Sequence, residues 1–386
     1  MSQEVKYVYV LGSVTVPTYS FVKMIHERYD PSEHLFYIPF GKAVLKVVPQ
    51  MREFQNICYP PEGNKIKQFF YELKLYRTAE RLILHGMFTG TWPMLPLLLL
   101  LIFFPKQTAK KLSWIEHGGD LYNWQYPHNT WKKPLIDWMN RKIRESASVL
   151  GVCHPADEAF LRSEFHTDAP CFYTQLRTMA DPFKVFDEVN VGTRNTSTKI
   201  IQIGHNAFQL GNHVHILDML EKFRYEDMRL ILPMSYGMTG VFGDVYGGHH
   251  YRKAVNIVAK TTFREKSVLF YRNVPRQNYF QYLWNVDIVI FDLYRQAGLG
   301  NIHPFLYMNK KIFLPAGTIL YDWLTSQGLE IYDTNQIPSM SYEEFIAPNK
   351  RSNREWIVDF LSKNSYELWD DFFRALNVEE HGLETE

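Results

Sequence analysis

The sequence predicts an α/β protein of two domains, each with a parallel sheet packed between helices. The chain has 386 residues, more than the roughly 250 to 300 at which single hydrophobic cores stop growing. Short apolar runs that end in glycine or polar residues alternate with helical stretches in both halves, which is typical of parallel sheets. The segment 176–197 ends in the turn-rich stretch GTRNTS and is the best candidate for a linker. We therefore expect one domain over 1–185, a second over 196–350, and a C-terminal helix and tail over 351–386.

The expected elements follow this alternation. In the first domain, short strands are expected at 7–12, 34–40, 81–86 and 111–119. In the second domain, the expected strands are 198–203, 229–233, 267–270, 286–291 and 311–315, and the expected helices are about 212–224, 249–260, 276–284, a segment after Gly300 and a segment from about Leu320. Ile216, Met219, Leu220 and Phe223 recur at helical spacing, which predicts one apolar stripe against a sheet. A last amphipathic helix over about 353–376 is expected to close back over the first domain.

The composition is that of a globular protein without a dominant charge. Hydrophobic residues make up 46% and charged residues 22% of the chain, and the formal net charge is +1. This balance gives no overall attraction for nucleic acid, so we expect no nucleic-acid partner. Cys58, Cys153 and Cys171 form no CxxC pair, which fits a reducing compartment and argues against a disulfide framework or a zinc ribbon. The N-terminal stretch lacks the basic start and long apolar segment of a signal peptide, so we expect a cytoplasmic protein.

One strongly apolar run, PMLPLLLLLIFFP, occupies residues 93–105 and is followed by Lys106, Lys110 and Lys111. A membrane-spanning helix needs about 20 apolar residues, so this run is too short to cross a bilayer. Two interpretations stay open: a buried helix of the first domain, or an interfacial segment over 93–111 whose lysines meet anionic lipid headgroups. The second interpretation would place the protein peripherally on the inner face of the cell membrane.

The stretch IVIFDLYRQAGLGN, residues 288–301, runs from a strand through a turn with two glycines into a helix. Gly298 and Gly300 would allow the backbone to approach a diphosphate at the helix N-terminus. Asn301 can cap that helix, and Arg295 can bind phosphate oxygens through two hydrogen bonds. The turn matches neither a Walker loop nor a strict GxGxxG motif, so a strand-to-helix connection without a ligand is the competing interpretation.

Several short motifs occur in a fixed order along the chain. They are Gly118, Gly119, Asp120, Leu121 and Tyr122; Gly204 with Asn206, followed by Asn212 and His215; Pro233, Met234 and Tyr236; and Arg295, Gln296, Gly298 and Gly300. In this order and approximate spacing, the sequence resembles the TDP-N-acetylfucosamine:lipid II N-acetylfucosaminyltransferase family of enterobacterial common antigen synthesis, from the start of the chain to about residue 335. The stretch Ile115–Asp120 and the loop 238–248 depart from the family pattern, so the identity of the substrates is not carried over.

The resemblance implies a GT-B glycosyltransferase architecture, in which two Rossmann-like domains face each other across a cleft and a C-terminal helix crosses back to the first domain. It implies a sugar donor linked to a nucleotide diphosphate, such as TDP or UDP, in the second domain, and a lipid-linked or polysaccharide acceptor in the first. The implied reaction is a metal-independent transfer of a sugar, such as an amino-deoxy sugar, in bacterial surface glycan synthesis, with no further cofactor.

Sugar transfer requires stabilisation of the charge on the leaving diphosphate and, in an inverting route, a base for the proton of the acceptor. Arg295 and the helix N-terminus at Gly298–Asn301 can supply the first. For the base, Asp120 is the first candidate and Glu116 or His117 the second, and capping of the following turn is the competing role for Asp120. The expected donor contacts are Gly204, Asn206, Asn212, His215, Tyr236, Tyr282, Arg295, Gln296, Gly298, Gly300 and Asn301, and the expected acceptor contacts are Gly12, Ser13 and His85.

Two other functions stay open. A nucleotide-sugar epimerase or hydrolase of the same fold would need acidic residues near the sugar or a water-activating base in the second domain, where Asp292 is the only acid close to the turn. A non-catalytic sugar-nucleotide binding subunit is compatible with the altered stretch Ile115–Asp120. We expect no metal site, because the histidine pairs at 213 and 215 and at 249 and 250 lack the i, i+4 spacing of helical zinc ligands.

Overall fold

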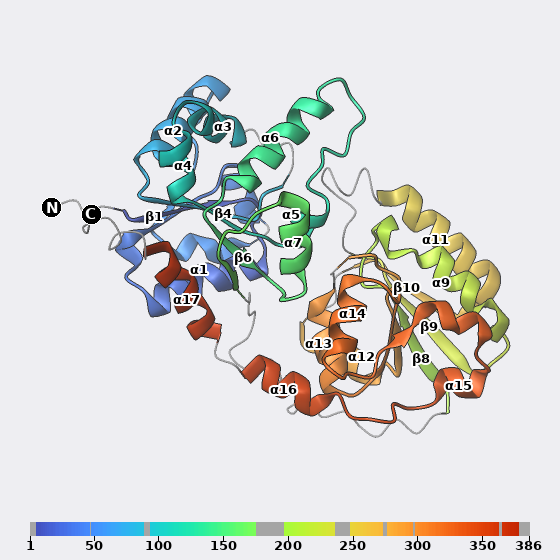
Figure 1. Cartoon of the computed structure of the whole chain (residues 1–386). Helices are drawn as coiled ribbons and strands as arrows, with labels where there is room; N and C mark the ends of the chain where they lie inside the picture. Colours follow the sequence, from blue (N-terminus) through green and yellow to red (C-terminus); the bar gives the residue numbers. More distant parts are fainter. Residues whose placement is uncertain are drawn as a thin grey trace. The chain divides into compact units, whose positions relative to one another are not determined.

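The computed structural model of the chain describes residues 5–46, 48–88, 93–174, 197–235, 248–272, 276–295, 298–362 and 365–377 (Figure 1). The chain forms two compact units. The first contains Met1–Ala180 together with Asn364–Glu386, and the second contains Asp181–Lys363. The linker predicted at 176–197 lies, except for Ser197, outside the described residues.

The first unit is built on a sheet of seven strands in the order β3-β2-β1-β4-β5-β6-β7, in which all neighbours run parallel. The strands are β1 (Tyr7–Leu11), β2 (His34–Tyr37), β3 (Ile57–Cys58), β4 (Arg81–His85), β5 (Leu112–Ile115), β6 (Val149–Val152) and β7 (Cys171–Tyr173). The helices are α1 (Val16–Arg28), α2 (Lys65–Thr78), α3 (Met94–Phe103), α4 (Pro105–Lys111), α5 (Gly119–Tyr122), α6 (Lys133–Glu145), α7 (Asp157–Phe165) and, from the end of the chain, α17 (Ser365–Asn377).

Helices cover both faces of this sheet, because its central strands are apolar on both sides. Every residue of β1, β4, β5 and β6 is buried. Figure 1 shows α2, α3, α4 and α6 on one face and α1 with α17 on the other. Leu82 and Leu84 belong to the core under α2, α3 and α6, whereas Ile83 belongs to the core that includes α1 and α17. This alternation is the period-two pattern of a strand buried on both faces.

The second unit has a sheet of six strands in the order β10-β9-β8-β11-β12-β13, again with parallel neighbours. The strands are β8 (Lys199–Ile203), β9 (Met228–Pro233), β10 (Ser267–Phe270), β11 (Ile288–Ile290), β12 (Lys311–Leu314) and β13 (Tyr332–Asp333). The helices are α9 (His213–Leu220), α11 (Gly248–Phe263), α12 (Arg276–Asn285), α13 (Leu299–Tyr307), α14 (Ile319–Ser326), α15 (Tyr342–Ile346) and α16 (Arg354–Ser362). The apolar stripe predicted from Ile216 to Phe223 is buried in one core with α11 and the sheet, as expected.

The apolar run at 93–105 forms α3 and the first residue of α4. Leu97, Leu98, Leu100 and Leu101 are buried in the core of the first unit, so most of the run is a structural helix. Only its end, from Ile102 to Pro105, is exposed. Among the described residues, no helix has the length and apolar character that crossing a membrane requires.

The C-terminal helix predicted over 353–376 is two helices. The polar residues from Ser362 to Ser365 interrupt the apolar pattern of the sequence at this point. Helix α16 contacts α13 of the second unit, whereas α17 buries Trp369, Phe372 and Phe373 in the core of the first. The expected return of the chain to the first domain is confirmed, and α17 alone makes it.

Each sheet has a point at which the order of its strands reverses. In the first unit the chain builds outward from β1 to β2 and β3, then returns to place β4 on the other side of β1. In the second unit the same reversal separates β8 from β11. Ligands of open α/β sheets bind beyond the carboxyl ends of the strands at such switch points. These two edges are therefore where functional side chains should lie.

Candidate functional site

The turns after β8 and β11 lie side by side at the switch point of the second sheet, because these strands pair. Gly204, after β8, has φ +62°, and Gly298, before α13, has φ +73°, a left-handed backbone that favours glycine. Both glycines also make room for histidine rings. A Cβ at Gly204 would lie 2.5 Å from His213 Nε2, and one at Gly298 would lie 3.1 Å from His205 Nδ1. The packing of His205 against Gly298 holds the two turns together.

The first turn of α13 is open to a ligand at Gly300. A Cβ at Gly300 would meet no atom of the described residues within 4 Å, so their packing does not require glycine at this position. Gly298 occupies the N-cap position predicted for Asn301, whose side-chain Oδ1 instead accepts a hydrogen bond from the Tyr279 hydroxyl. Arg295 is half-buried beside the turn. Burial, and then the charge of Arg295, lower the pKa of His205 to about 3.

A histidine and a carboxylate pair at the same edge. His215 Nδ1, in α9, lies 2.8 Å from Oδ2 of Asp292, two residues after the end of β11. The Asp292 side chain is only 11% exposed, whereas that of His215 is 55% exposed. Asn212, at the N-cap of α9, donates from Nδ2 to the Asp292 carbonyl at 3.4 Å. Because the carboxylate fixes Nδ1, Nε2 of the same ring is left for a ligand or a proton.

Other side chains predicted to contact the donor are engaged within the second unit. The Tyr282 hydroxyl donates to Gln202 Oε1 at 2.6 Å, and Gln202 Nε2 donates to the Gly204 carbonyl at 2.8 Å. Asn206 Nδ2 lies 2.7 Å from His205 Nε2. These contacts shape the turn after β8, and a direct contact with the donor stays a prediction. Two further predicted contacts, Tyr236 and Gln296, lie outside the described residues.

At the switch point of the first sheet, the ends of β1 and β4 approach closely. The Gly12 amide donates to the His85 carbonyl at 3.0 Å, and a Cβ at Gly12 would lie 1.8 Å from the carbonyl oxygen of Gly86. Only glycine fits there. The Ser13 carbonyl accepts a hydrogen bond from the Thr18 hydroxyl at 3.1 Å, near the start of α1. Gly12 and Ser13 therefore hold these strand ends, whether or not an acceptor binds.

Two histidine rings meet beside these strand ends. His85 is buried and His117 half-buried, their ring centroids are 4.5 Å apart, and His85 stacks on Phe21 at 4.2 Å. Within the described part of the chain, three ring nitrogens lack a hydrogen-bond partner: Nδ1 and Nε2 of His85, and Nε2 of His117. Burial lowers the pKa of both rings, and the neighbouring His117 lowers that of His85 further. Both imidazoles are therefore neutral at pH 7 and can accept a proton or a hydrogen bond.

The Asp120 carboxylate accepts three hydrogen bonds. Oδ2 accepts from Trp114 Nε1 at 2.9 Å and from the Met87 amide, and Oδ1 accepts from the His117 amide at 2.6 Å. Beneath it, Arg144 Nη2 donates to the carbonyls of Met87 at 2.7 Å and of Asp120 at 3.0 Å. This network fixes the loop after β5. The geometry favours a positioning role for Asp120, and its role as a base stays a prediction.

Glu116 is also buried and engaged. Its carboxyl group accepts hydrogen bonds from the amides of Gly118 and Cys153. Burial, and then the charges of Asp157 and Asp120, raise the pKa of Glu116 well above its usual range. Both carboxyl oxygens of Glu116 are thus engaged by backbone amides, and its role as a base stays a prediction.

Sequence reasoning missed His205, Trp114 and Arg144 at these two edges. The position of His205 directly after Gly204, the glycine that follows β8, was the one available signal. Trp114 and Arg144 act through contacts that the linear sequence does not reveal. Within the described ranges, no group of three or more His, Cys, Asp or Glu side chains is arranged to hold a metal ion.

No known family model matches the chain. Solved structures nevertheless resemble it over nearly its whole length. A UDP-forming α,α-trehalose-phosphate synthase from Burkholderia vietnamiensis is 9% identical, with a TM-score of 0.62 and 96% of both chains covered. The N-terminal domain of Candida albicans trehalose-6-phosphate phosphatase is 12% identical, with a TM-score of 0.60 over 97% of this chain and 100% of that one. An S. aureus MnaA–UDP co-structure is 12% identical, with a TM-score of 0.50 over 91% and 90%.

At these identities the likeness shows the fold alone. The specific N-acetylfucosaminyltransferase family therefore stays a prediction. The two parallel sheets, each covered by helices, and the likeness to the trehalose-phosphate synthases establish the fold class. The chain has the two-domain, Rossmann-like GT-B fold.

Proposed function

We propose that the protein is a glycosyltransferase that moves a sugar from a nucleotide-diphosphate donor, bound by the second unit, to an acceptor bound by the first. The observation that carries the proposal is the carboxyl edge shared by β8 and β11. It brings together the guanidinium of Arg295, the open N-terminus of α13 at Gly300 and the His215–Asp292 pair. Two solved structures of this fold involve UDP, the S. aureus MnaA–UDP co-structure and the UDP-forming trehalose-phosphate synthase, which supports a nucleotide diphosphate as the ligand.

The proposed donor chemistry concerns the leaving group. When the bond between the sugar C1 and the phosphate oxygen breaks, the electron pair leaves with the diphosphate. Unpaired N–H groups at the N-terminus of α13 and the charge of Arg295 stabilise that anion. His215, whose Nδ1 is held by Asp292, can add a further hydrogen bond to the diphosphate through Nε2. We propose no metal and no further cofactor, so activity is expected to persist in EDTA.

The proposed acceptor chemistry needs a base in the first unit. The acceptor oxygen forms the new bond to C1, and in an inverting route its proton passes to that base. Of the three predicted candidates, His117 combines a neutral ring with a buried Nε2 that has no described partner. We therefore assign His117 as the base and Asp120 as the residue that positions it through the His117 amide. A lipid-linked or polysaccharide acceptor, as in bacterial surface glycan synthesis, completes the proposal.

One observation favours a second candidate function. The His215–Asp292 pair is a carboxylate-oriented imidazole in the second unit. Such a pair can take a proton from water or from a sugar carbon, as a nucleotide-sugar hydrolase or epimerase would require.

Product analysis tests these alternatives together. The full-length protein is incubated with TDP-, UDP- and GDP-linked sugars, with and without a lipid-diphosphate acceptor. A new glycolipid supports the proposed transferase, and its absence with every donor contradicts it. Free sugar or an epimer, formed without the acceptor, identifies the second candidate. Nucleotide binding without turnover identifies a non-catalytic binding subunit.

A further inference from the structure

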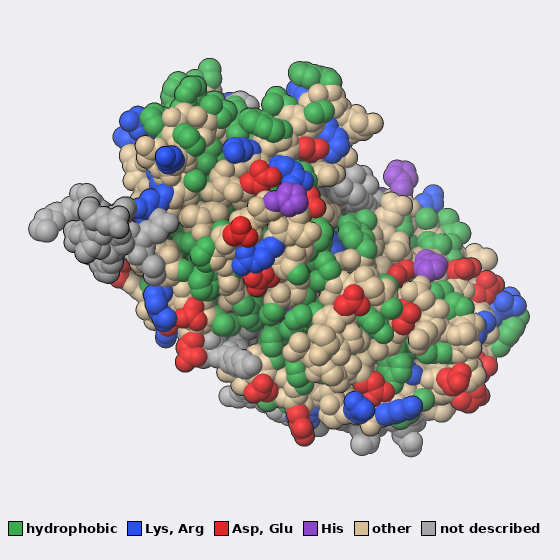
Figure 2. All heavy atoms as spheres, in the orientation of Figure 1, with side chains coloured by type: hydrophobic (Ala, Val, Ile, Leu, Met, Phe, Trp, Pro, Cys, Tyr) green, Lys and Arg blue, Asp and Glu red, His purple; other side chains and the backbone are tan. Residues whose placement is uncertain are grey.

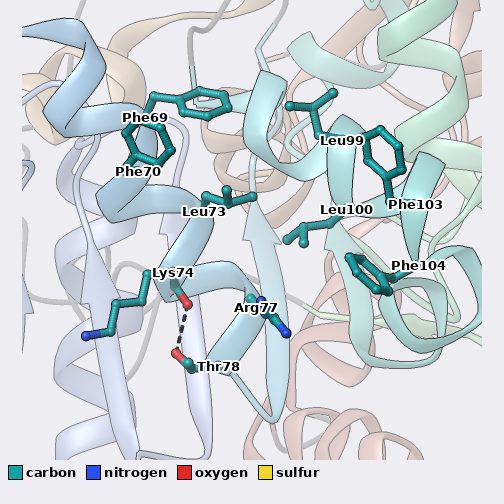
Figure 3. Close-up of a pocket in the computed structure, with 10 residues that line it drawn as sticks. All are labelled: Phe69, Phe70, Leu73, Lys74, Arg77, Thr78, Leu99, Leu100, Phe103 and Phe104. Atoms are coloured by element: carbon teal, nitrogen blue, oxygen red, sulfur yellow. Dashed lines mark hydrogen bonds between the residues drawn. The ribbon is translucent and has the colours of Figure 1, made fainter.

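An apolar groove lies between α2 and α3 on the outer side of the first unit. It has a volume of about 540 Å³ and is lined by Phe69, Phe70 and Leu73 from α2 and by Leu99, Leu100 and Phe103 from α3. Figure 3 shows these side chains along the groove, with Lys74 and Arg77 at one end. Phe70 is 61% and Phe103 70% exposed. Such large aromatic surfaces are unusual on a helix that faces only water.

A second apolar ridge lies on α6 and the turn that leads into it. Trp131, Leu135 and Trp138 are spaced at i, i+4 and i+7 and are 84%, 62% and 49% exposed. The opposite side of the helix, with Asn140 and Ile143, is buried. Helix α6 contacts α3, which itself contacts α2, so the groove and the ridge belong to one region of the first unit. Figure 2 shows hydrophobic side chains gathered over these helices.

We call this region the docking face and define it by Phe70, Phe103, Phe104, Trp131, Leu135 and Trp138.

The helices around the groove carry a strong positive charge. Lysine and arginine occur four times in α2 and three times in α4, and α3 has none. Of these seven, Lys111 donates from Nζ to the carbonyls of Tyr76, Arg77 and Ala79, which leaves six for the surface charge. The single acidic residue of these three helices, Glu72, is buried and accepts hydrogen bonds from Tyr37 and Gln68. The chain as a whole has a formal net charge of only +1. The cationic surplus is therefore concentrated beside the docking face.

We propose that the docking face seats the first unit on the surface of an anionic lipid bilayer. Phenylalanine and leucine side chains would enter the acyl boundary, tryptophan would lie at headgroup level, and the lysines would meet anionic headgroups. The inserting residues come from three helices. From the 93–105 run they include Phe103 and Phe104, whereas Leu97, Leu98, Leu100 and Leu101 are buried in the core. The inference goes beyond the proposed function, to which it adds access to a lipid-linked acceptor.

Vesicle binding tests the proposal without any sugar donor. The result can therefore be interpreted even if the protein is not a glycosyltransferase. The full-length protein is sedimented with phosphatidylcholine vesicles, with and without phosphatidylglycerol. We expect binding to the anionic vesicles that falls with added salt, and little binding to the neutral ones. The triple variant Phe103→Ser, Trp131→Ser, Trp138→Ser should partition about tenfold more weakly at an unchanged melting temperature.

Tyr225→Ser is the matched control, because Tyr225 is an aromatic residue with 83% exposure in the second unit. It should bind vesicles like the wild type. The single variants Phe103→Ser and Trp131→Ser keep the test informative if the triple variant loses its fold. Equal vesicle binding by the wild type and the folded serine variants would overturn the proposal. A wild-type dimer that ignores vesicles and becomes monomeric in the variants would overturn it as well, since the face would then pair two copies of the chain.

Discussion

Arg295 follows β11 at the switch point of the second sheet, where the proposed leaving group acquires its negative charge. Removing one group that stabilises such charge typically lowers turnover by about 100-fold or more. We expect this loss for Arg295→Ala, with an unchanged melting temperature. The measurement is turnover with the donor that the product analysis identifies. Arg272→Ala, at an exposed arginine of the same unit, should leave turnover unchanged. Full activity of the Arg295 variant would remove Arg295 from the mechanism.

His34 gives the first unit a dependence on pH. It is buried at the start of β2, its Nδ1 lies 2.8 Å from the Tyr9 hydroxyl, and burial lowers its pKa to about 4 against the opposing charge of Asp30. Unfolded histidine titrates near about 6.5, so below this pH the unfolded chain binds the proton and the folded chain does not. The free energy of unfolding therefore decreases as the pH is lowered from about 6.5 towards the folded pKa of about 4. This residue contributes a decrease of at most about 1.4 kcal/mol per pH unit.

His34→Gln should remove this contribution. Urea unfolding at about pH 7 and about pH 5 should show a smaller loss of stability on acidification than in the wild type. His128→Gln, at an exposed histidine, should keep the wild-type slope. Identical slopes for the wild type and the His34 variant would contradict the assigned pKa.

Glycines that shape the backbone of a turn were easier to predict from the sequence than the roles of individual side chains. Gly204 and Gly298 stood out because they follow or precede apolar runs, and the structure shows both with a positive φ. The role of Asp120 could not be derived in the same way. Its hydrogen-bond donors include Trp114 and Met87, which reach it only after β4 and β5 have paired.

At the scale of elements, a substitution at the N-terminus of α13 should affect nucleotide binding and folding stability in different directions. Gly300 lies in the first turn of this helix, and an added Cβ would meet no atom of the residues that the structure describes within 4 Å. Alanine is a better helix former than glycine by up to about 1 kcal/mol. Gly300→Ala should therefore fold at least as stably as the wild type, yet bind nucleotide diphosphate more weakly if phosphates approach the backbone there.

Thermal unfolding and calorimetric titration with TDP and UDP check this pair of outcomes. Gly298→Ala is the comparison, because its φ of +73° strains any residue with a Cβ, and it should lose stability. Unchanged nucleotide affinity in a stable Gly300→Ala variant would place the phosphates elsewhere.

The strands of the second unit were predicted more completely than those of the first. Strand β10 coincides with its predicted range of 267–270, and β8 and β9 deviate by one residue at the start. Three strands of the first unit, β3, β6 and β7, were not predicted. They have only two to four residues, too few to establish a period. Pairing with a preformed neighbouring strand gives them their structure.

At the scale of the whole molecule, the two-unit organisation followed from length and alternation, while the assignment of the last helix required the structure. Trp369 of α17 is 1% exposed within the core of the first unit. Replacing a large buried aromatic residue by alanine typically costs about 3–5 kcal/mol. We expect Trp369→Ala to lower the free energy of unfolding by this amount in denaturant titrations. Trp138→Ala, at 49% exposure, should change it by less than about 0.5 kcal/mol.

The return of α17 to the first unit also has a consequence for biosynthesis. Domains generally fold as units while the chain emerges from the ribosome, the N-terminal one first. Here the sheet of the first unit is synthesised before the second unit, but Trp369, Phe372 and Phe373, which complete the core on one of its faces, follow the second unit in the sequence. The second unit is synthesised in the meantime and is free to fold. The core of the first unit can therefore be completed only after the second unit has been synthesised, and until α17 has emerged from the ribosome the apolar face that it covers is open to aggregation.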